Sequence, residues 1–515
     1  MTVFYPLTAV IFILSVPVLR RAKAFFYGKS HYQCTMEEFD TVIQGGIVVT
    51  EASETPADVG IIGERIAAIG HGLWGKNTID AIGLLVMPGG VDSHCHLEQL
   101  WADGTTDAES FVSGSISAFA GGTTTAVTFS TQFKGRPIGP SLQEYRRRAN
   151  SAMIDYAFHQ IITDPTDDVI HREIPALAEA GIMSLKIFLT YDAFHLDDRA
   201  FLRTLAAARR AGMLVTVHCE NYAGIAWMSE ALLAAGLTTP KYHAWSRPVM
   251  LEREATHRAI ALAEMVDQPI QIFHVSCAEV AEEIARAQQR GVKVWAETCP
   301  QYLTLTAADM DRPGFEGAKY MCSPSPRDEA AAAGLWQAIK NGVIGNISSD
   351  HSGFPMQGSQ GKRSRGDDAA FPDILNGVPG VAARLPLIFS EGVAAGRISA
   401  SDFVRLTATH PARLFGLHDK GRIAAGADAD IVLWDPAKKI LMSNKTMQHA
   451  IDYTPYEGRT VTGWPVLTMR RGAVVMSHGQ VHAAPGTGRY IPRSRYELIA
   501  PSGRLPNGFE ASRFA

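Results

Sequence analysis

The sequence predicts an α/β protein: a (β/α)8 TIM barrel with a small β-sandwich domain built from both chain ends. Three observations lead to this prediction. Eight short apolar runs alternate with Ala-rich amphipathic stretches through the middle of the chain. Polar and ionisable residues stand at the ends of several of these runs, where the functional residues of such barrels lie. Short strand-like runs with turn residues also occur on both sides of this middle region.

The barrel prediction depends on the order of the runs. Amphipathic stretches such as Arg199–Ala211, Arg253–Val266 and Glu279–Arg290 separate most of them and have the periodicity of surface helices. Eight strands that alternate with helices favour a closed parallel barrel. The strand-like runs are Leu84–Val91, Thr123–Ser130, Asp155–Ile162, Ser184–Thr190, Leu214–Glu220, Pro269–Ser276, Lys293–Thr298 and Val343–Ser349.

The flanking segments predict the second domain. Strand-like runs fill the stretch from Phe39 to Leu85, and a similar pattern runs from Lys420 to about Val475. We therefore expect one β-sandwich made from two distant pieces. The expected division is an N-terminal apolar extension at 1–35, the N-terminal piece of the sandwich at 36–88, the barrel at 89–415, the C-terminal piece of the sandwich at 416–478 and a C-terminal tail at 479–515.

The two ends of the chain each leave alternatives open. Residues 3–19 are strongly apolar, but they lack the basic leading region of a signal peptide and are short for a membrane-spanning helix. Since Met36-Glu-Glu-Phe-Asp resembles the start of a soluble enzyme, residues 1–35 are either an extension outside the fold or a membrane anchor. The tail has arginines among prolines and glycines, so it either contacts a neighbouring subunit or is a loose terminus.

Composition excludes several classes of protein. The chain has 515 residues, is 46% hydrophobic and 19% charged, and carries a net charge of −4, which gives no basic surface for nucleic acid. Five of its six cysteines, all but Cys34, lie within a few residues of candidate site positions, and no Cys-x-x-Cys pair occurs. We expect these thiols to be small buried apolar groups of a cytoplasmic protein; soft metal ligands are the alternative.

Six residues with metal-binding chemistry stand at the ends of successive predicted strands. Two histidines separated by one residue project from the same face of a strand and can chelate one ion, although such pairs are more often packing or surface residues. Further imidazoles and a carboxylate at other strand ends favour zinc or a similar divalent cation. The six are His94, His96, Lys186, His218, His274 and Asp350.

Lys186 is the most unusual of the six. It lies within Ser-Leu-Lys-Ile-Phe-Leu, where a lysine side chain points into a packed barrel. Burial of an ammonium group is costly unless its pKa falls, so the lysine either reaches the rim or is converted by CO2 to a carbamate. A carbamate would be an anionic ligand with two oxygens that can bridge two metal ions.

Several longer motifs resemble the dihydropyrimidinase and hydantoinase branch of the amidohydrolase superfamily. The resemblance extends from about Phe39 to Gly458. It is carried by Met-Pro-Gly-Gly-Val-Asp-Ser-His-Cys-His, Gly121-Gly-Thr-Thr-Thr, Lys186-Ile-Phe-Leu-Thr-Tyr, Glu297-Thr-Cys-Pro-Gln-Tyr-Leu, Asn376-Gly-Val-Pro-Gly, Arg384-Leu-Pro-Leu-Ile-Phe-Ser-Glu-Gly and Asp452-Tyr-Thr-Pro-Tyr-Glu-Gly. The resemblance implies a hydrolase of cyclic amides that opens 5-substituted hydantoins or 5,6-dihydropyrimidines to N-carbamoyl amino acids.

The resemblance also implies the metal ligands and the reaction. Two divalent ions, Zn2+ or alternatively Mn2+ or Co2+, would be held at one site by His94, His96, carboxylated Lys186 and Asp350. The second site would consist of Lys186, His218 and His274. A metal-bridging hydroxide would attack the ring carbonyl, and Asp350 would transfer the proton to the leaving nitrogen.

For the substrate, the resemblance implies three polar contacts and a gate. Tyr191 would stabilise the oxyanion, and Ser323 and Asn376 would hold the cyclic imide; both could instead be turn residues beside prolines. A hydrophobic gate would consist of Trp101, Phe188 and His195. A histidine there is less apolar than is usual in the family. The chain also departs from the family pattern at Ser352-Gly353, where Ala-Pro commonly follows Asp-His, and at Ser325, where a second proline is expected. The preferred ring substituent therefore stays open.

Two alternatives to this function remain. An allantoinase or dihydroorotase would catalyse a related ring opening, but a dihydroorotase needs a cation where this chain has Glu98. A non-catalytic scaffold of the same fold would have lost metal ligands, whereas all six are present here. We expect a small cyclic amide or imide as substrate, no nucleic-acid partner, and a homotetramer or dimer, as the resemblance implies.

Overall fold

The structure is a computed structural model that describes residues 38–101 and 106–505. The predicted extension at 1–35, with its apolar residues 3–19, lies outside the described residues, and so does Cys34. No helix in the described ranges is both long and apolar enough to span a membrane.

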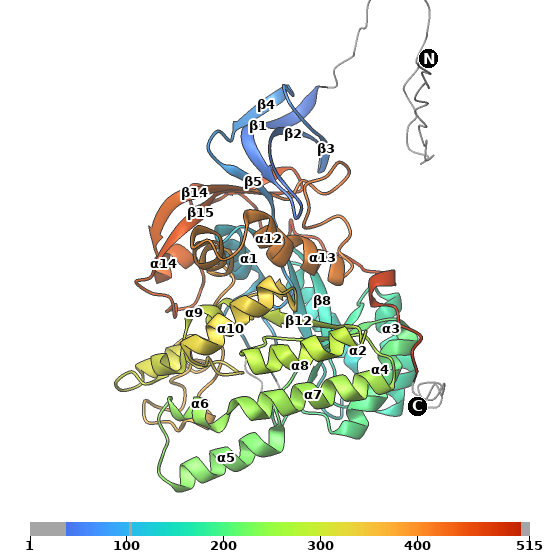
Figure 1. The fold of residues 1–515 in the computed structure, drawn as a ribbon, viewed down its shortest axis with the longest axis vertical. Helices are drawn as coiled ribbons and strands as arrows, with labels where there is room; N and C mark the ends of the chain where they lie inside the picture. Colours follow the sequence, from blue (N-terminus) through green and yellow to red (C-terminus); the bar gives the residue numbers. More distant parts are fainter. Residues whose placement is uncertain (1–37, 102–105, 506–515) are drawn as a thin grey trace, which may run out of the picture. The chain divides into compact units, whose positions relative to one another are not determined.

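Eight parallel strands form the barrel, as the sequence predicts (Figure 1). They pair in the order in which they occur along the chain. The ends of the sheet meet at its carboxyl-terminal edge, where Asp350 N donates to His94 O at 2.9 Å and His96 N donates to His351 O at 2.8 Å. The strands are β6 (Gly90–Asp92), β7 (Thr123–Thr131), β8 (Asp155–Ile161), β9 (Ser184–Phe188), β10 (Leu214–His218), β11 (Ile270–Ile272), β12 (Val294–Thr298) and β13 (Ile344–Ile347).

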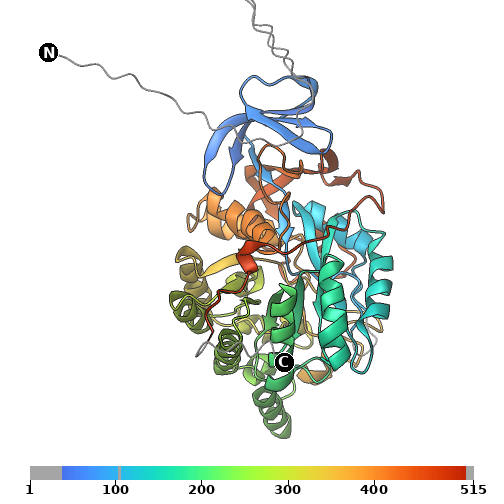
Figure 2. The same ribbon diagram turned by 90° about the vertical axis from the view of Figure 1, so that its right-hand side faces the viewer.

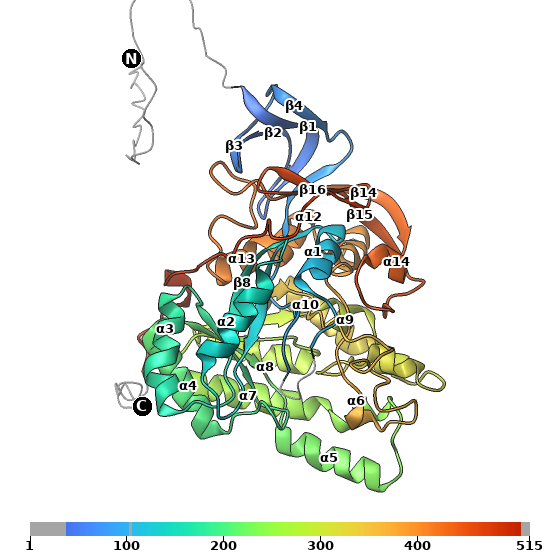
Figure 3. The same ribbon diagram turned by 180° about the vertical axis from the view of Figure 1, so that it is seen from behind.

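Helices cover the outside of the barrel, and Figures 1 and 3 show them from opposite sides. Several of them begin and end with standard caps; for example, the Asp197 side chain accepts a hydrogen bond from Ala200 N, and Gly212 ends the same helix in the left-handed conformation. The α-helices are α1 (Phe111–Ala120), α2 (Ile138–Ala149), α3 (Ile174–Glu179), α4 (Asp198–Ala211), α5 (Tyr222–Ala234), α6 (Tyr242–Ser246), α7 (Val249–Met265), α8 (Ala278–Gln289), α9 (Pro300–Thr304), α10 (Glu329–Lys340), α11 (Arg384–Ile388), α12 (Ala400–Val404), α13 (His410–Leu414) and α14 (Asn444–Met447). Short 3-10 and π segments are η1 (Val169–Glu173), η2 (Ala307–Met310), η3 (Glu316–Tyr320), η4 (Phe371–Asp373), η5 (Phe389–Ala394), η6 (Arg405–Thr409) and η7 (Glu497–Ile499).

The first predicted barrel strand, Leu84–Val91, is wrong as a single element. Its first half is β5 (Leu85–Pro88), which pairs with β1 and β14 in the other sheet. The change of sheet occurs at two glycines: Gly89 N donates to Asp430 O at 2.8 Å, and Gly90 N donates to Gly122 O at 2.9 Å. A side chain on Gly89 would collide with Thr124, because its Cβ would lie 2.2 Å from the Thr124 Oγ1.

Both chain ends contribute strands to the second sheet, which confirms the predicted β domain. Hydrogen bonds join its nine strands into one mixed sheet, in which β5 links the N-terminal strands to β14. In Figure 1 the blue and orange strands accordingly lie side by side. A core of its own, including Val59, Ile431 and Met469, stabilises this sheet. Its strands are β1 (Phe39–Val49), β2 (Glu54–Ile62), β3 (Arg65–Gly70), β4 (Gly75–Asp80), β5, β14 (Ile431–Leu441), β15 (Thr460–Arg470), β16 (Ala473–Ser477) and β17 (Gln480–Val481).

A buried charge cluster joins the start of β8 to the start of β14. The ammonium group of Lys420 lies 2.6 Å from Asp155 and 2.9 Å from each of Asp428 and Asp430. These three carboxylates are close enough to hold a metal ion. Because Lys420 already contacts all three, while Arg65 pairs with Asp428 and Arg471 with Asp155, we interpret the cluster as a structural ion-pair network.

The C-terminal strap, which we define as residues 486–504, packs along the barrel of its own chain (Figure 2). It pairs with the start of β8, since Tyr156 N donates to Arg489 O and Ile491 N donates to Tyr156 O. The side chain of Arg493 is buried and donates to the Ser184 Oγ at 3.0 Å. The described portion of the tail is therefore ordered against the barrel, which the sequence pattern did not indicate.

Candidate metal centre

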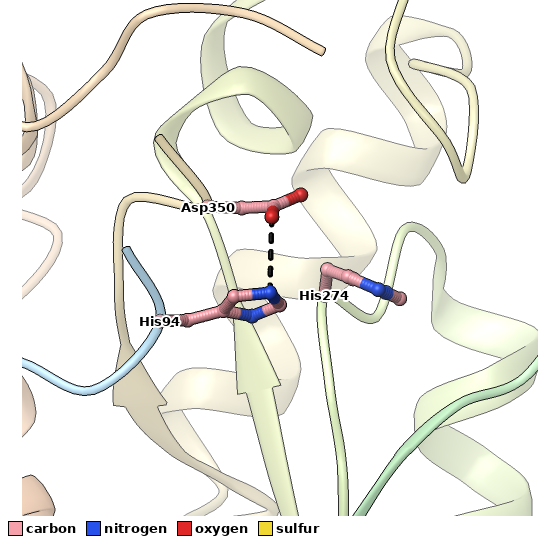
Figure 4. Close-up of side chains that lie close together, drawn as sticks. All are labelled: His94, His274 and Asp350. Atoms are coloured by element: carbon pink, nitrogen blue, oxygen red, sulfur yellow. Dashed lines mark ion pairs between the residues drawn. The ribbon is translucent and has the colours of Figure 1, made fainter. Parts of the chain in front are cut away.

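The carboxyl ends of five barrel strands bring the six predicted ligands together. His94 and His96 follow β6, Lys186 lies within β9, His218 ends β10, His274 follows β11 and Asp350 follows β13. The ligand atoms of His94, His274 and Asp350 lie within 4.8 Å of one another (Figure 4). Both His94 Nε2, at 3.0 Å, and His96 Nε2, at 3.3 Å, approach the same oxygen of Asp350.

The two histidines after β6 are oriented by different partners. His94 Nδ1 lies 2.7 Å from an oxygen of Glu297, and His96 Nδ1 lies 2.6 Å from the amide oxygen of Gln99. Both partners accept a hydrogen bond, so each ring carries a hydrogen on Nδ1 and turns Nε2 towards Asp350. This is the arrangement in which a histidine binds a metal ion through Nε2.

His218 is held in the reverse sense. His218 Nε2 lies 2.7 Å from Glu220, which in turn accepts a hydrogen bond from Arg247 at 2.6 Å, so Nδ1 of His218 is its free nitrogen. Burial lowers the pKa of His218 and of His274 well below the ordinary value, which leaves both rings neutral. The ring centroids of these histidines are 4.3 Å apart.

Lys186 is almost completely buried, which excludes a lysine that reaches the rim. Its Nζ lies 4.3 Å from the ring centroid of Phe273, 4.7 Å from that of Phe188 and 5.8 Å from that of Phe129. Burial lowers the pKa of this lysine to about 8, so about a tenth of it is a neutral, nucleophilic amine at pH 7.

These residues fit a site for divalent cations. Nδ1 of His274 is buried and has no hydrogen-bond partner among the described residues, which is costly unless another ligand satisfies it. The donors are imidazole nitrogens and a carboxylate, the set that zinc and related ions prefer. A lysine beside them that can become an anionic carbamate would balance the charge of the cations.

A cavity of about 640 Å³ opens above these residues and contains the predicted substrate contacts. The Tyr191 hydroxyl donates to Asn376 Oδ1 at 3.3 Å, and Ser323 Oγ donates to the same oxygen at 2.8 Å. Burial raises the pKa of Tyr191 to about 12, so its hydroxyl is protonated at neutral pH and can donate to a developing oxyanion.

The aromatic wall of the cavity differs from the predicted gate at one position. Trp101 and Phe188 line the cavity, whereas His195 does not. The ring of His195 instead stacks on Tyr222, with centroids 4.0 Å apart, and its Nδ1 lies 3.1 Å from Tyr191 O. Phe194 lines the cavity instead, because residues 191–195 form a tight turn that begins with Tyr191 in the left-handed conformation at φ 71°. The wall is therefore more apolar than the sequence indicated.

Sequence reasoning missed the residues that support the ligands. Glu297 is the last residue but one of β12, close to a strand end like the ligands, so its place in the barrel was the available signal. Glu220 and Gln99 follow ligands by two and three residues and carry no comparable signal. The five cysteines in the described ranges are free and buried, as predicted.

Comparisons with known proteins show to which family the chain belongs. Residues 85–475 match the Amidohydrolase family. A D-hydantoinase of Rhizobium radiobacter is 43% identical over 463 residues, which cover 89% of this chain and 100% of that protein. A D-hydantoinase of Geobacillus stearothermophilus is 43% identical, with 89% and 97% covered. The crystal structure of a dihydropyrimidinase from Brevibacillus agri aligns with a TM-score of 0.86 at 40% identity and covers 89% of this chain and 99% of that one.

The family match covers far more than half of the chain, and these relatives align over almost their whole length. Together with a barrel whose strand ends gather histidines, a lysine and an aspartate, they show that the chain belongs to the amidohydrolase family and is a metal-dependent hydrolase of cyclic amides.

Proposed function

We propose that the protein opens the ring of 5-substituted hydantoins or 5,6-dihydropyrimidines to give N-carbamoyl amino acids. One observation carries the proposal: the metal-ligand residues form the floor of a cavity whose wall contains Tyr191, Ser323 and Asn376. Such a cavity offers a cyclic imide polar contacts on one side and metal chemistry on the other. The names of the relatives, D-hydantoinase and dihydropyrimidinase, support the same substrate class.

We propose that two divalent cations bind here, most simply Zn2+, with Mn2+ or Co2+ as alternatives. His94, His96, Lys186 and Asp350 would hold one ion, and Lys186, His218 and His274 would hold the other. Lys186 would serve both ions as a carbamate, and its depressed pKa supports the reaction with CO2. Such a pair of ions, when bound, polarises the ring carbonyl and lowers the pKa of water.

The residues around the ions would each have a separate task. Asp350 would accept the proton of the attacking water and pass it to the leaving ring nitrogen; its Oδ1 lies within 3.3 Å of both His94 and His96, at the floor of the cavity. The Tyr191 hydroxyl would donate to the carbonyl oxygen as negative charge develops there. Ser323 and Asn376 would hold the imide edge of the ring.

The aromatic wall would receive the substituent on the ring. Trp101, Phe188, Phe194 and Phe354 line this side of the cavity, and aromatic rings offer a large apolar contact area. We propose that an aryl or other apolar group at position 5 packs here, which favours 5-substituted hydantoins over the unsubstituted ring.

Ring-opening activity tests this function directly. The purified protein would be supplied with zinc and bicarbonate and assayed on dihydrouracil, hydantoin, both enantiomers of 5-phenylhydantoin, allantoin and dihydroorotate. We expect 5-phenylhydantoin to react fastest, and we expect Lys186→Ala to be inactive. A preference for dihydrouracil would indicate pyrimidine breakdown, and a preference for allantoin or dihydroorotate would replace the proposal by one of those activities.

The structure disfavours dihydroorotate as a substrate. Glu98 stands at the position where a dihydroorotase needs a cation, and its carboxylate accepts a hydrogen bond from Phe111 N at 3.1 Å, at the start of α1. It does not line the cavity. If none of the substrates reacted and no metal bound, the proposed enzymatic function would be wrong and the non-catalytic scaffold would take its place.

We further propose a cytoplasmic homotetramer. The free, buried cysteines support a reducing compartment. Exposed Trp227, Trp245 and Met250, on α5, α6 and α7 respectively, support subunit contacts in that region. Light scattering coupled to size-exclusion chromatography tests the assembly: four times the monomer mass supports the tetramer, and twice that mass would replace it by the dimer.

A further inference from the structure

One loop beside the cavity contains a buried lysine that the proposed mechanism does not use. Residues 354–376 include several that line the cavity, among them Phe354, Ser364 and Asn376. Lys362 lies in the middle of this loop, but it is only 1% exposed and does not line the cavity. Its side chain therefore points into the protein behind the substrate contacts.

The ammonium group of Lys362 joins the two segments that carry the imide contacts. Nζ donates to Leu375 O at 2.9 Å and to Met321 O at 3.3 Å. Leu375 immediately precedes Asn376, and Met321 lies two residues before Ser323. The same two segments are linked directly, since Gly377 N donates to Met321 O at 2.8 Å.

Folding stability alone does not account for a lysine here. No carboxylate in the described chain forms an ion pair with Lys362, and burial lowers its pKa to about 7. A buried cation whose partners are neutral carbonyls opposes folding, and an apolar side chain of similar volume is often neutral or stabilising in its place. The three donors of an ammonium group can, however, hold two carbonyls at a fixed separation, which no apolar side chain can do.

We infer that Lys362 is a positioning residue for substrate binding: it fixes the 321–323 and 375–377 segments so that Ser323 and Asn376 meet the ring together. This inference rests on the proposed function, because it concerns the same cavity. Lys362 contacts none of the six metal-ligand residues, so its role is separate from metal binding. The distance between two imide-binding segments depends on it.

Replacement of Lys362 by methionine removes both hydrogen bonds and keeps most of the buried volume. We expect kcat/KM for 5-phenylhydantoin to fall by about 10- to 100-fold, because small displacements of binding groups have effects of this size. Most of the loss should be a higher KM. The zinc content and the melting temperature should stay at the wild-type value or rise.

Lys293 supplies a matched control. Its ammonium group also joins two backbone carbonyls, those of Leu498 at 3.2 Å and Ala500 at 2.7 Å, but it ties the C-terminal strap and is remote from the cavity. Lys293→Met should therefore lower the melting temperature and leave KM unchanged. A third variant, Lys362→Gln, keeps hydrogen-bond donors without the charge and should recover some of the loss in KM.

The experiment compares steady-state kinetics, zinc content and thermal unfolding for the four proteins. A raised KM in Lys362→Met alone, with partial recovery in Lys362→Gln, supports the inference. Wild-type KM in a folded Lys362→Met would overturn it. If Lys362→Met does not fold, the test is made on Lys362→Gln. A lower melting temperature with unchanged KM in that variant would overturn the inference and make Lys362 a structural residue. An inactive wild type would overturn the proposed function and this inference together, whereas an active wild type with unchanged variants would overturn this inference alone.

Discussion

Glu297 offers the most direct test of how the metal centre is built. Its carboxylate is completely buried and lies 2.7 Å from Nδ1 of His94, so it fixes the tautomer and the orientation of that ring. Its other oxygen accepts a hydrogen bond from Asn346 at 3.3 Å. Glu297→Gln keeps the shape and one acceptor oxygen but removes the negative charge that makes His94 a stronger ligand.

The size of the effect follows from these contacts. Mutation of a carboxylate that supports a metal-bound histidine lowers metal affinity by about 10- to 100-fold, or about 1.4–2.7 kcal/mol. The new amide group would face the side-chain amide of Asn346, whose own oxygen has no partner among the described residues, so a flip of Asn346 relieves the conflict. We therefore expect a folded variant with weaker metal binding. His96 gives a natural comparison, because a neutral amide, Gln99, already holds its Nδ1 at 2.6 Å.

Competition with a coloured chelator would measure the zinc affinity of both proteins at equal pH, and thermal unfolding with and without zinc would report the same quantity independently. Glu264→Gln serves as the control, since Glu264 forms an exposed ion pair with Arg290 at 3.0 Å, away from the cavity. Wild-type zinc affinity in a correctly folded Glu297→Gln would refute the reasoning, because it would mean that the carboxylate does not act through His94.

Three further predictions concern the cavity and the core. Tyr191→Phe should lower kcat by about 10²- to 10³-fold with little change in KM, measured with 5-phenylhydantoin, because the ring stays and only the oxyanion donor is lost. Burial raises the pKa of Asp107 from 3.8 to about 7. Between these two pH values the native state holds a proton that the unfolded chain has lost. The free energy of unfolding therefore falls as the pH rises from one value to the other. Asp107→Asn should accordingly increase the free energy of unfolding at pH 8, by up to about 4 kcal/mol, and not at pH 4, measured by urea titration. Lys420→Met removes the cation that contacts all three buried carboxylates, leaving Arg471 on Asp155 and Arg65 on Asp428, and should lower the free energy of unfolding by about 3–5 kcal/mol. Lys319→Met, which breaks an exposed pair with Glu316, should change it by less than about 1 kcal/mol in the same titration.

The barrel could be predicted because its strands are buried on both faces and appear in the sequence as continuous apolar runs. The same property caused the error at Leu84–Val91. Both sheets are apolar there, so the composition does not change where the chain leaves one sheet and enters the other. Only the close packing at Gly89 marks the boundary, and close packing involves residues that are distant in sequence.

The candidate site likewise contains residues that could be predicted from the sequence and residues that could not. The six metal-ligand residues could be proposed because strand ends converge at one edge of a barrel. His195 could not be placed correctly, because the direction of its side chain depends on the turn that follows β9. The place of Glu297 near a strand end was a signal, but its contact with His94, 203 positions away, was not. The contact of Lys362 with Met321, 41 positions away, likewise has no signal in a single sequence.

The backbone at His274 allows a test of the strain in the site. His274 has φ 42°, in the left-handed region, as do Asp350 at 47° and Tyr191 at 71°. This conformation costs a residue other than glycine about 1–2 kcal/mol, and such residues concentrate at functional sites. His274→Ala and His274→Gly both remove the imidazole, but only glycine relieves the strain. After the greater flexibility of glycine in the unfolded chain is subtracted, metal-free His274→Gly should be about 0.5–1 kcal/mol more stable than His274→Ala. Both should lose zinc. Urea titration of the metal-free proteins measures the difference, and a more stable alanine variant would show that the left-handed backbone stores no strain at this ligand.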